Sequence, residues 1–113
     1  MCNKNELDTI LGHLAVQVKE LFGDRLKDII LFGSYARGDY DNESDIDVMI
    51  LVDMDAEQLY IHRSTVRGIA RKIDCDYSVV TSIILQEYNL FQKYINASGF
   101  YNNVLREGVS VGN

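Results

Sequence analysis

The sequence predicts an α/β (α+β) fold, a small mixed β-sheet with helices packed on it. Apolar residues at helical spacing alternate with short continuous apolar runs, in the order helix, strand, strand, helix, strand, helix. The length of 113 residues fits one domain, expected over residues 1–113. A chain of this size buries roughly two thirds of its unfolded surface, which leaves little room for a deep pocket. We therefore expect a partner to complete any site for a large substrate.

Four elements are expected in the first half of the chain. Residues 6–22 carry apolar side chains at helical spacing, and Gly23 follows as a stop signal. Residues 26–32 (LKDIILF) form a short apolar run that is typical of a buried strand. A short helix is expected at 34–37, followed by a stretch rich in turn residues. Residues 45–52 (DIDVMILV) predict a second strand with a polar entrance.

The second half predicts the remaining elements. Residues 55–72 have a broken helical stripe, and residues 74–80 (DCDYSVV) return to strand composition. Helical spacing then recurs over 82–95, and a short helix is expected over 100–106. Residues 109–111 predict an edge strand or a docked tail.

The composition excludes several classes of function. There are 11 Lys and Arg residues against 17 Asp and Glu, a net charge of -6, so direct nucleic-acid binding is not expected. Cys2 and Cys75 lie far apart without the spacing of a zinc site. No window approaches the ~18 apolar residues of a membrane span, and the first ten residues lack the apolar core of a signal peptide. We expect a cytoplasmic protein without a membrane partner.

The stretch from residue 33 to residue 47, GSYARGDYDNESDID, predicts a phosphate-binding and metal-binding site. Gly33 lets a phosphate approach the backbone, and Ser34 adds a hydroxyl donor at a helix start. Asp45 and Asp47 are two apart on a strand, so their side chains share one face with Cα atoms about 6.5 Å apart. Carboxylates placed in this way suit a pair of metal ions, which lie about 3.5 to 4 Å apart in two-metal sites.

A third carboxylate is expected from the strand predicted over 74–80. Asp74 and Asp76 both stand on that strand, and either could join the first pair if the strand lies beside it. Arg37 follows the Gly-Ser turn, where its guanidinium could reach a phosphate or pair with the acidic loop.

These residues resemble the minimal nucleotidyltransferases of the DNA polymerase beta superfamily, in particular the MntA-type antitoxins of HEPN/MNT pairs. The family signature is Gly-Ser, ten residues, then Asp-x-Asp, which Gly33-Ser34 and Asp45-Ile46-Asp47 match without a gap. The ARG and SDIDV segments around this signature, and VLREGV near the end of the chain, are also similar to the family. The resemblance implies the polymerase-beta-like nucleotidyltransferase fold.

The resemblance also implies the roles of individual residues. Gly33 and Ser34, with Arg37, would hold the triphosphate of ATP, and Asp45 and Asp47 would ligate two Mg²⁺ ions. The third carboxylate of the family is assigned to Asp76, because Asp-Tyr-Ser-Val-Val best resembles the family's aspartate and apolar run. Asp74 is the alternative.

By the same resemblance, the chain would act as an antitoxin in a hetero-oligomer with a HEPN-type toxin. It would transfer AMP from ATP to a hydroxyl of the toxin, expected to be a tyrosine. Two alternatives remain: a catalytically silent module that neutralises its partner by occlusion, and a small-molecule nucleotidyltransferase completed by a second subunit. The acceptor and the nucleotide preference stay open.

A row of arginines marks the helix predicted over 55–72. Arg63, Arg67 and Arg71 follow one another at i, i+4 spacing in an otherwise acidic chain. Such a row is either a solvated helix face with weak ion pairs or a docking face for a partner.

Overall fold

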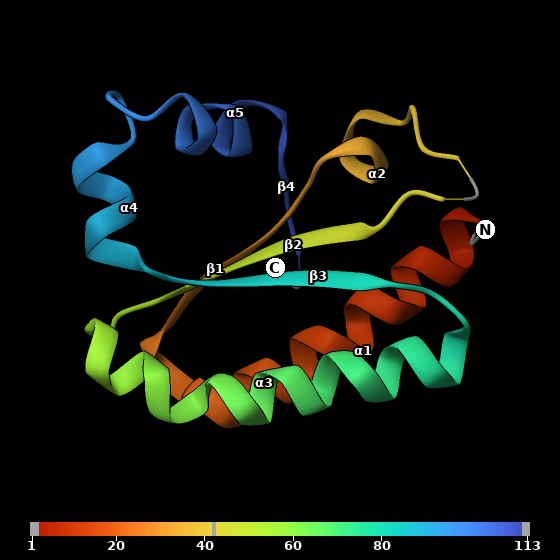
Figure 1. The fold of residues 1–113 in the computed structure, drawn as a ribbon, viewed down its shortest axis with the longest axis horizontal. Coiled ribbons are helices and arrows are strands. Elements are labelled where there is room, and N and C mark those ends of the chain that lie inside the picture. Colours follow the sequence, from red (N-terminus) through yellow and green to blue (C-terminus); the bar gives the residue numbers. More distant parts are fainter. Residues whose placement is uncertain (1–2, 42, 112–113) are drawn as a thin grey trace.

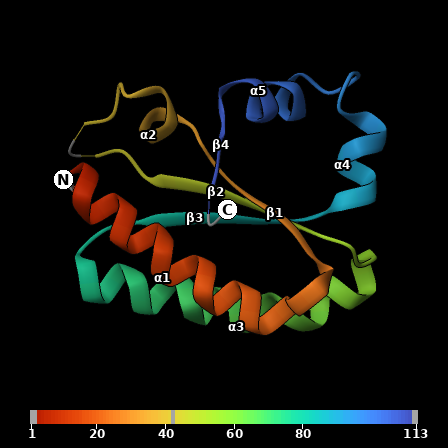
Figure 2. The same ribbon diagram turned by 180° about the vertical axis from the view of Figure 1, so that it is seen from behind.

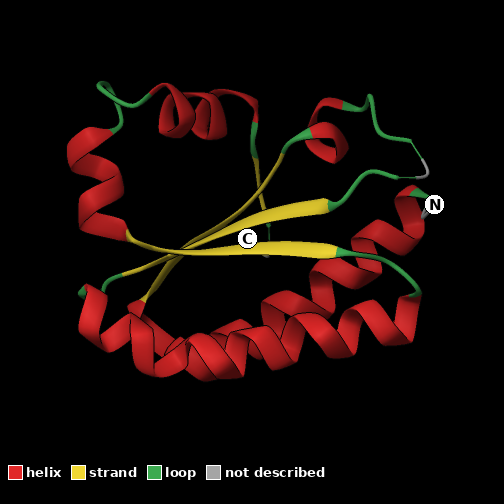
Figure 3. Ribbon diagram, viewed as in Figure 1, coloured by secondary structure: helices red, strands yellow, loops and turns green. Residues whose placement is uncertain are grey.

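The computed structural model describes residues 3–41 and 43–111 and contains both helices and strands (Figures 1 and 3). The helical segments are α1 (Lys4–Phe22), the short 3₁₀ turn η1 (Gly23–Arg25), α2 (Ser34–Arg37), α3 (Ala56–Tyr77), α4 (Tyr88–Tyr94) and α5 (Gly99–Glu107). The strands are β1 (Leu26–Phe32), β2 (Ile46–Val52), β3 (Thr81–Glu87) and β4 (Val109–Ser110). The predicted mixed α/β fold is confirmed.

The strands form one mixed sheet in the order β3-β2-β1-β4. β1 runs antiparallel to both β2 and β4, whereas β2 and β3 are parallel and are joined by the crossover helix α3. The register places Asp47 between Phe32 of β1 and Ser82 of β3. The polar start of β2 therefore lies beside the end of β1 and the start of β3.

Helices cover both faces of the sheet. α1 and α3 lie against one face, and α4 and α5 lie on the opposite side (Figures 1 and 2). The central strand β2 is buried on both sides, which explains its continuous apolar run: Val48 and Ile50 join the core under α1 and α3, while Met49 joins the core under α4 and α5.

Side-chain caps fix the starts of the two long helices. Asn3 accepts a hydrogen bond from the Glu6 amide at 2.9 Å, at the start of α1. At the start of α3, Asp55 and Gln58 form a capping box in which each side chain accepts from the other's backbone amide. No helix within the described part of the chain has the length and apolar content needed to cross a bilayer.

The structure corrects the prediction in the region after residue 72. The strand predicted over 74–80 is wrong, because α3 continues to Tyr77 and β3 begins only at Thr81. The helix predicted over 82–95 is wrong in its first half, since only Tyr88–Tyr94 is helical. α3 ends at Ser78 in the left-handed conformation (φ 54°), a position where glycine would be the usual sequence signal.

Candidate functional site

The turn between β1 and α2 is built on Gly33. Its backbone has φ 75° and ψ −156°, a conformation that favours glycine. The amides of Ala36 and Arg37 both donate to the Gly33 carbonyl at 3.1 Å, which closes the single turn of α2. The chain therefore turns sharply at the end of β1, and Ser34 is held at the start of the following helix.

Asp47 lies directly against this turn. A Cβ built on Gly33 would collide with Oδ2 of Asp47 and would lie 3.2 Å from its Cγ. The pairing of Asp47 with Phe32, the residue before Gly33, produces this close approach. Glycine is therefore required at position 33 for two reasons, its backbone conformation and the space that the carboxylate occupies.

Asp47 faces the side of the sheet that carries α5. Its neighbours Ile46 and Val48 are buried in the core under α1 and α3, so the side chain between them points to the other face. Partial burial raises the pKa of Asp47, the Asp45 carboxylate raises it further, and Arg37 lowers it. Asp45 and Arg37 thus act electrostatically on Asp47.

A pocket of about 380 Å³ opens over this corner. One side is formed by the β1 to α2 turn and β2, and α5 forms the other. The residues from the first side are Phe32, Gly33, Ser34, Arg37 and Asp47. Those from α5 are Phe100, Asn103, Val104 and Glu107. The structure therefore brings four of the predicted site residues to one pocket, and Asp45 adjoins it next to β2.

Arg37 is held by two carboxylates at the edge of the pocket. Its Nε donates to Asp39 at 3.2 Å, and its Nη1 donates to Glu107 at 3.5 Å. The hydrogen bond and charge of Asp39 raise the pKa of Arg37, with a smaller contribution from Glu107. The pair with Glu107 connects α2 to α5 across the pocket, so a phosphate that reached Arg37 would compete with these carboxylates.

The structure does not bring Asp76 to this corner. Asp76 is exposed on α3, where it forms an i,i+4 ion pair with Lys72 at 3.3 Å. Asp74 also belongs to α3, and its Oδ1 accepts from the amide and the hydroxyl of Thr81, both at 2.8 Å. The prediction that both aspartates stand on a strand beside Asp47 is wrong, because both belong to α3. This helix lies against the opposite face of the sheet from α5.

The β3 position that pairs with Asp47 is occupied by Ser82. Paired residues of parallel strands point to the same face, so a hydroxyl stands where a third carboxylate was expected. Within residues 3–41 and 43–111, no group of three or more His, Cys, Asp or Glu side chains is arranged to hold a metal ion. Among the acidic residues at this corner, Asp39 and Glu107 are paired with Arg37, whereas Asp45 and Asp47 lie at the start of β2.

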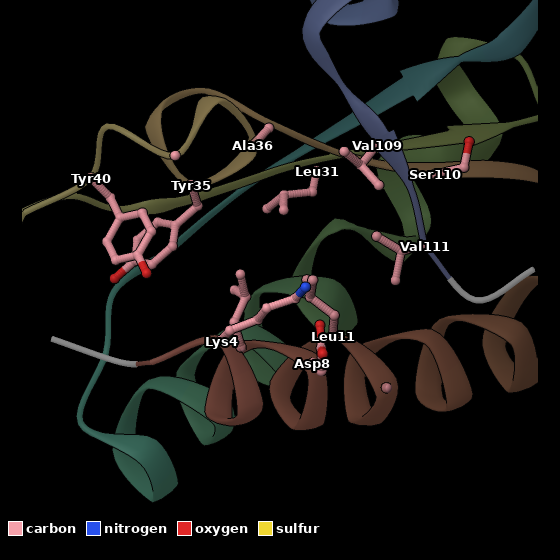
Figure 4. A pocket seen from close by; sticks show the side chains of 13 residues that line it. Lys4, Asp8, Leu11, Leu31, Tyr35, Ala36, Tyr40, Val109, Ser110 and Val111 are labelled. Atoms are coloured by element: carbon pink, nitrogen blue, oxygen red, sulfur yellow. The ribbon is translucent and has the colours of Figure 1, made fainter.

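A larger pocket of about 610 Å³ lies elsewhere, between α1, α2 and the β4 edge (Figure 4). Tyr35 and Tyr40 stack at one end, with ring centroids 4.3 Å apart and an interplanar angle of 11°. Leu11 and Leu31 contribute apolar surface, and neither Asp45 nor Asp47 lines it. The predicted site therefore belongs to the smaller pocket.

The sequence analysis did not predict that α5 forms one wall of the pocket. Phe100, Asn103 and Glu107 come from a segment some 55 residues beyond Asp47, and no local spacing connects the two. The signal available was the VLREGV segment. Its Gly108 packs so closely that a Cβ there would collide with the Val104 carbonyl and the Ile30 side chain, which fixes the end of α5 against β1.

The Gly33 turn, Ser34 and Asp47 line one open pocket, and Asp45 precedes β2 beside it, so the Gly-Ser and Asp-x-Asp segments of the nucleotidyltransferase signature lie together in the fold. The nucleotidyltransferase domain family matches residues 13–104, and the chain belongs to this family. The family assignment predicted from the Gly-Ser and Asp-x-Asp signature is confirmed.

Two relatives from Methanocaldococcus jannaschii are described as candidate protein adenylyltransferases. One is 45% identical over 91 residues, covering 80% of this chain and 83% of the relative. The other is 36% identical over 107 residues, covering 94% of this chain and 99% of the relative. The similarity therefore extends over most of both chains.

Two solved structures share the fold at low sequence identity. One is a toxin-antitoxin complex with AMP-PNP, with a TM-score of 0.51 and 17% identity, covering 88% of this chain and 70% of that chain. The other is a variant of the MntA-HpeT toxin-antitoxin, with a TM-score of 0.50 and 16% identity, covering 96% of this chain and 72% of that chain. Their similarity supports the observed arrangement of helices and strands.

Proposed function

We propose that this nucleotidyltransferase transfers AMP from ATP to a hydroxyl of a partner toxin and thereby acts as an antitoxin. The observation that carries the proposal is the convergence of Gly33, Ser34 and Asp47 on one pocket, with Asp45 beside it. The descriptions of the two relatives support a protein as the acceptor. The toxin-antitoxin structures that share the fold support a toxin as the partner.

Asp45 and Asp47 are the residues that would hold Mg²⁺. Carboxylate oxygens are the ligands that this ion prefers, and Mg²⁺ is commonly bound by one or two carboxylates together with substrate phosphates. Burial raises the pKa of Asp47 and the Asp45 charge raises it further, so a cation bound between the two carboxylates would offset their repulsion. When bound, Mg²⁺ would neutralise charge on the triphosphate.

The remaining residues position the nucleotide. Gly33 and Ser34 line the pocket, and the Ser34 hydroxyl can donate to a phosphate oxygen of the nucleotide. In the transfer, the acceptor oxygen bonds to the α-phosphorus, the bond from that phosphorus to the bridging oxygen of the β-phosphate breaks, and pyrophosphate leaves. The hydroxyl proton passes to solvent or to a base of the partner. Catalysis by this chain is then chiefly positioning and charge stabilisation.

The partner would supply the acceptor. The pocket is small and is bounded by this chain only at the corner of the sheet and α5, so a second protein can approach the nucleotide. A HEPN-type toxin presenting a tyrosine is the partner that the family resemblance implies.

The second candidate is a silent module that neutralises its partner by occlusion. The observation that favours it is Ser82, which occupies the β3 position beside Asp47 where a third carboxylate was expected. Such a module would keep the fold and could bind nucleotide without performing transfer.

The two candidates are separated by incubating the chain with the product of the adjacent gene, Mg²⁺ and ATP labelled at the α- or the γ-phosphate. Transfer of AMP predicts α-label and a nucleotidyl mass gain on the partner, with no γ-label. Asp47→Asn should lose the label, whereas Asp76→Asn, an identical change on the exposed face of α3, should keep it. A stable, neutralised complex without label would establish the silent module instead.

A further inference from the structure

β3 is an edge strand, since no other strand of residues 3–41 and 43–111 pairs with its outer side. It pairs with β2 along seven residues and ends the sheet on that side (Figure 1). Its middle consists of Ile83, Ile84 and Leu85, which are only partly buried. An exposed edge with apolar side chains is a place where another strand can add to the sheet.

The backbone groups that face outward can be identified from two hydrogen bonds. The Ile46 amide donates to the Val80 carbonyl at 2.8 Å, whereas the Thr81 amide turns away from β2 and donates to Asp74. Backbone groups alternate in direction along a strand, so those of Ser82 and Ile84 face β2. The amides and carbonyls of Ile83 and Leu85 therefore face outward and are available to an added strand.

Two arginines flank this edge. Arg63 and Arg67 of α3 line a groove of about 400 Å³ together with Thr81, Ile83 and Leu85. Both side chains are exposed, and neither forms an ion pair with another residue of the described ranges 3–41 and 43–111. Arg71, the third member of the row, does not line the groove.

We propose that the edge of β3 binds an extended, acidic segment of a partner protein, which adds to the sheet as a further strand. Backbone pairing at Ile83 and Leu85 would supply the hydrogen bonds, and Arg63 and Arg67 would pair with the acidic side chains. The positive groove contrasts with the net charge of -6 of the chain, which argues for charge complementarity as the basis of recognition.

A second copy of this chain fits the edge less well. Two copies joined antiparallel through β3 would bring the arginine rows of the two α3 helices toward each other, and like charges would repel. The arginines therefore oppose self-association through this edge while favouring an acidic strand. This inference rests on the edge and its charges, and it holds whether or not the chain transfers AMP.

The probe is a synthetic peptide that alternates Glu and Val over eight residues, compared with a peptide that alternates Lys and Val. Amide exchange measured by NMR on the full chain should show Ile83 and Leu85 exchanging quickly alone and slowly with the Glu peptide. The Ile84 amide, which already pairs with β2, should stay protected throughout. The Lys peptide should leave all three amides unchanged.

The arginines are tested by Arg63→Glu combined with Arg67→Glu, which should weaken binding of the Glu peptide by about tenfold or more. Arg71→Glu makes the same charge change on the same helix outside the groove and should change binding by less than about twofold. Equal binding of both peptides, no protection at Ile83 and Leu85, or a dimer that protects these amides without peptide would each overturn the proposal.

Discussion

Gly33 and Asp47 lie in contact across the β1 and β2 pair, and the Asp47 carboxylate occupies the space that a side chain at position 33 would need. The Gly-Ser turn and the Asp-x-Asp strand are thus one structural unit, although eleven residues separate Ser34 from Ile46 in the chain. A substitution at either residue should therefore alter the position of the other.

Gly33→Ala is expected to lower the free energy of unfolding by about 1–3 kcal/mol, because it adds backbone strain at φ 75° and a collision with Asp47. It should also displace the carboxylate and weaken Mg²⁺-ATP binding. Gly68→Ala is the matched control, since a Cβ there meets nothing within 4 Å and should stabilise helix α3 by about 0.5–1 kcal/mol. Urea unfolding of both variants measures the change in the free energy of unfolding. Equal changes in the two variants would contradict the contact between Gly33 and Asp47.

The raised pKa of Asp47 predicts a pH dependence of stability. The folded chain holds this proton more tightly than the unfolded chain, so the associated stability is present below the ordinary Asp pKa and is lost as pH rises through the folded value. Asp47→Asn should remove this dependence and should be at least as stable as the natural chain at neutral pH. Unfolding curves recorded between pH 4 and pH 7 test this, with the exposed Asp24→Asn as control. A loss of stability at neutral pH would contradict the assigned burial effect.

Much of the fold was predictable because local signals and tertiary packing agree in the first half of the chain. The run 26–32 became β1 without change, and the stretch 45–52 became β2 with only its first residue outside the strand. After residue 72 the signals conflict. The sequence from Asp74 to Tyr77 is compatible with a helix or a strand. The helix ends at Ser78, where the sequence lacks the glycine that usually marks a helix end.

The misplaced strand explains the misplaced third carboxylate. The apolar residues Ile83, Ile84 and Leu85 fit a helical stripe as well as a strand, and only pairing with β2 decides between them. Because β3 begins only at Thr81, Asp76 belongs to helix α3, which lies on the other side of the sheet from α5. Similarly, the α5 wall of the pocket depends on a long-range packing contact that no local pattern reveals.

Substitutions of Asp74 and Asp76 should separate their structural roles. Asp74→Ala removes two hydrogen bonds to Thr81 and should cost about 1–2 kcal/mol of stability. Asp76→Ala breaks only an exposed ion pair and should change stability by less than about 0.5 kcal/mol. Neither change should affect the Mg²⁺ affinity measured by calorimetry. A large loss of Mg²⁺ binding in Asp76→Ala would instead place that carboxylate in the metal site.

The ion pair between Arg37 and Glu107 should oppose nucleotide binding. Glu107→Gln releases Arg37 from one carboxylate and removes a negative charge from the pocket, so ATP affinity should rise by up to about fivefold. Arg37→Gln should lower it. Glu20→Gln, an exposed change on α1, serves as the charge-matched control in the same titration. Weaker ATP binding in Glu107→Gln would show that Glu107 supports the nucleotide site.

Ser82→Asp should add a third carboxylate beside Asp47. The two positions are paired in the sheet and point to the same face, so Mg²⁺ affinity should rise by about tenfold as the number of charged ligands increases. Ser64→Asp on the exposed part of α3 adds the same charge away from the site and should leave the affinity unchanged. Equal behaviour of the two variants would mean that Asp47 does not face a metal.

The most direct test of the nucleotide site is calorimetric titration of the chain with AMP-PNP in the presence of Mg²⁺. The natural chain should bind the analogue, binding should depend on Mg²⁺, and both Asp45→Asn and Asp47→Asn should abolish that dependence while retaining the fold. Binding that is unchanged in both variants would contradict the assignment of this corner as the nucleotide site.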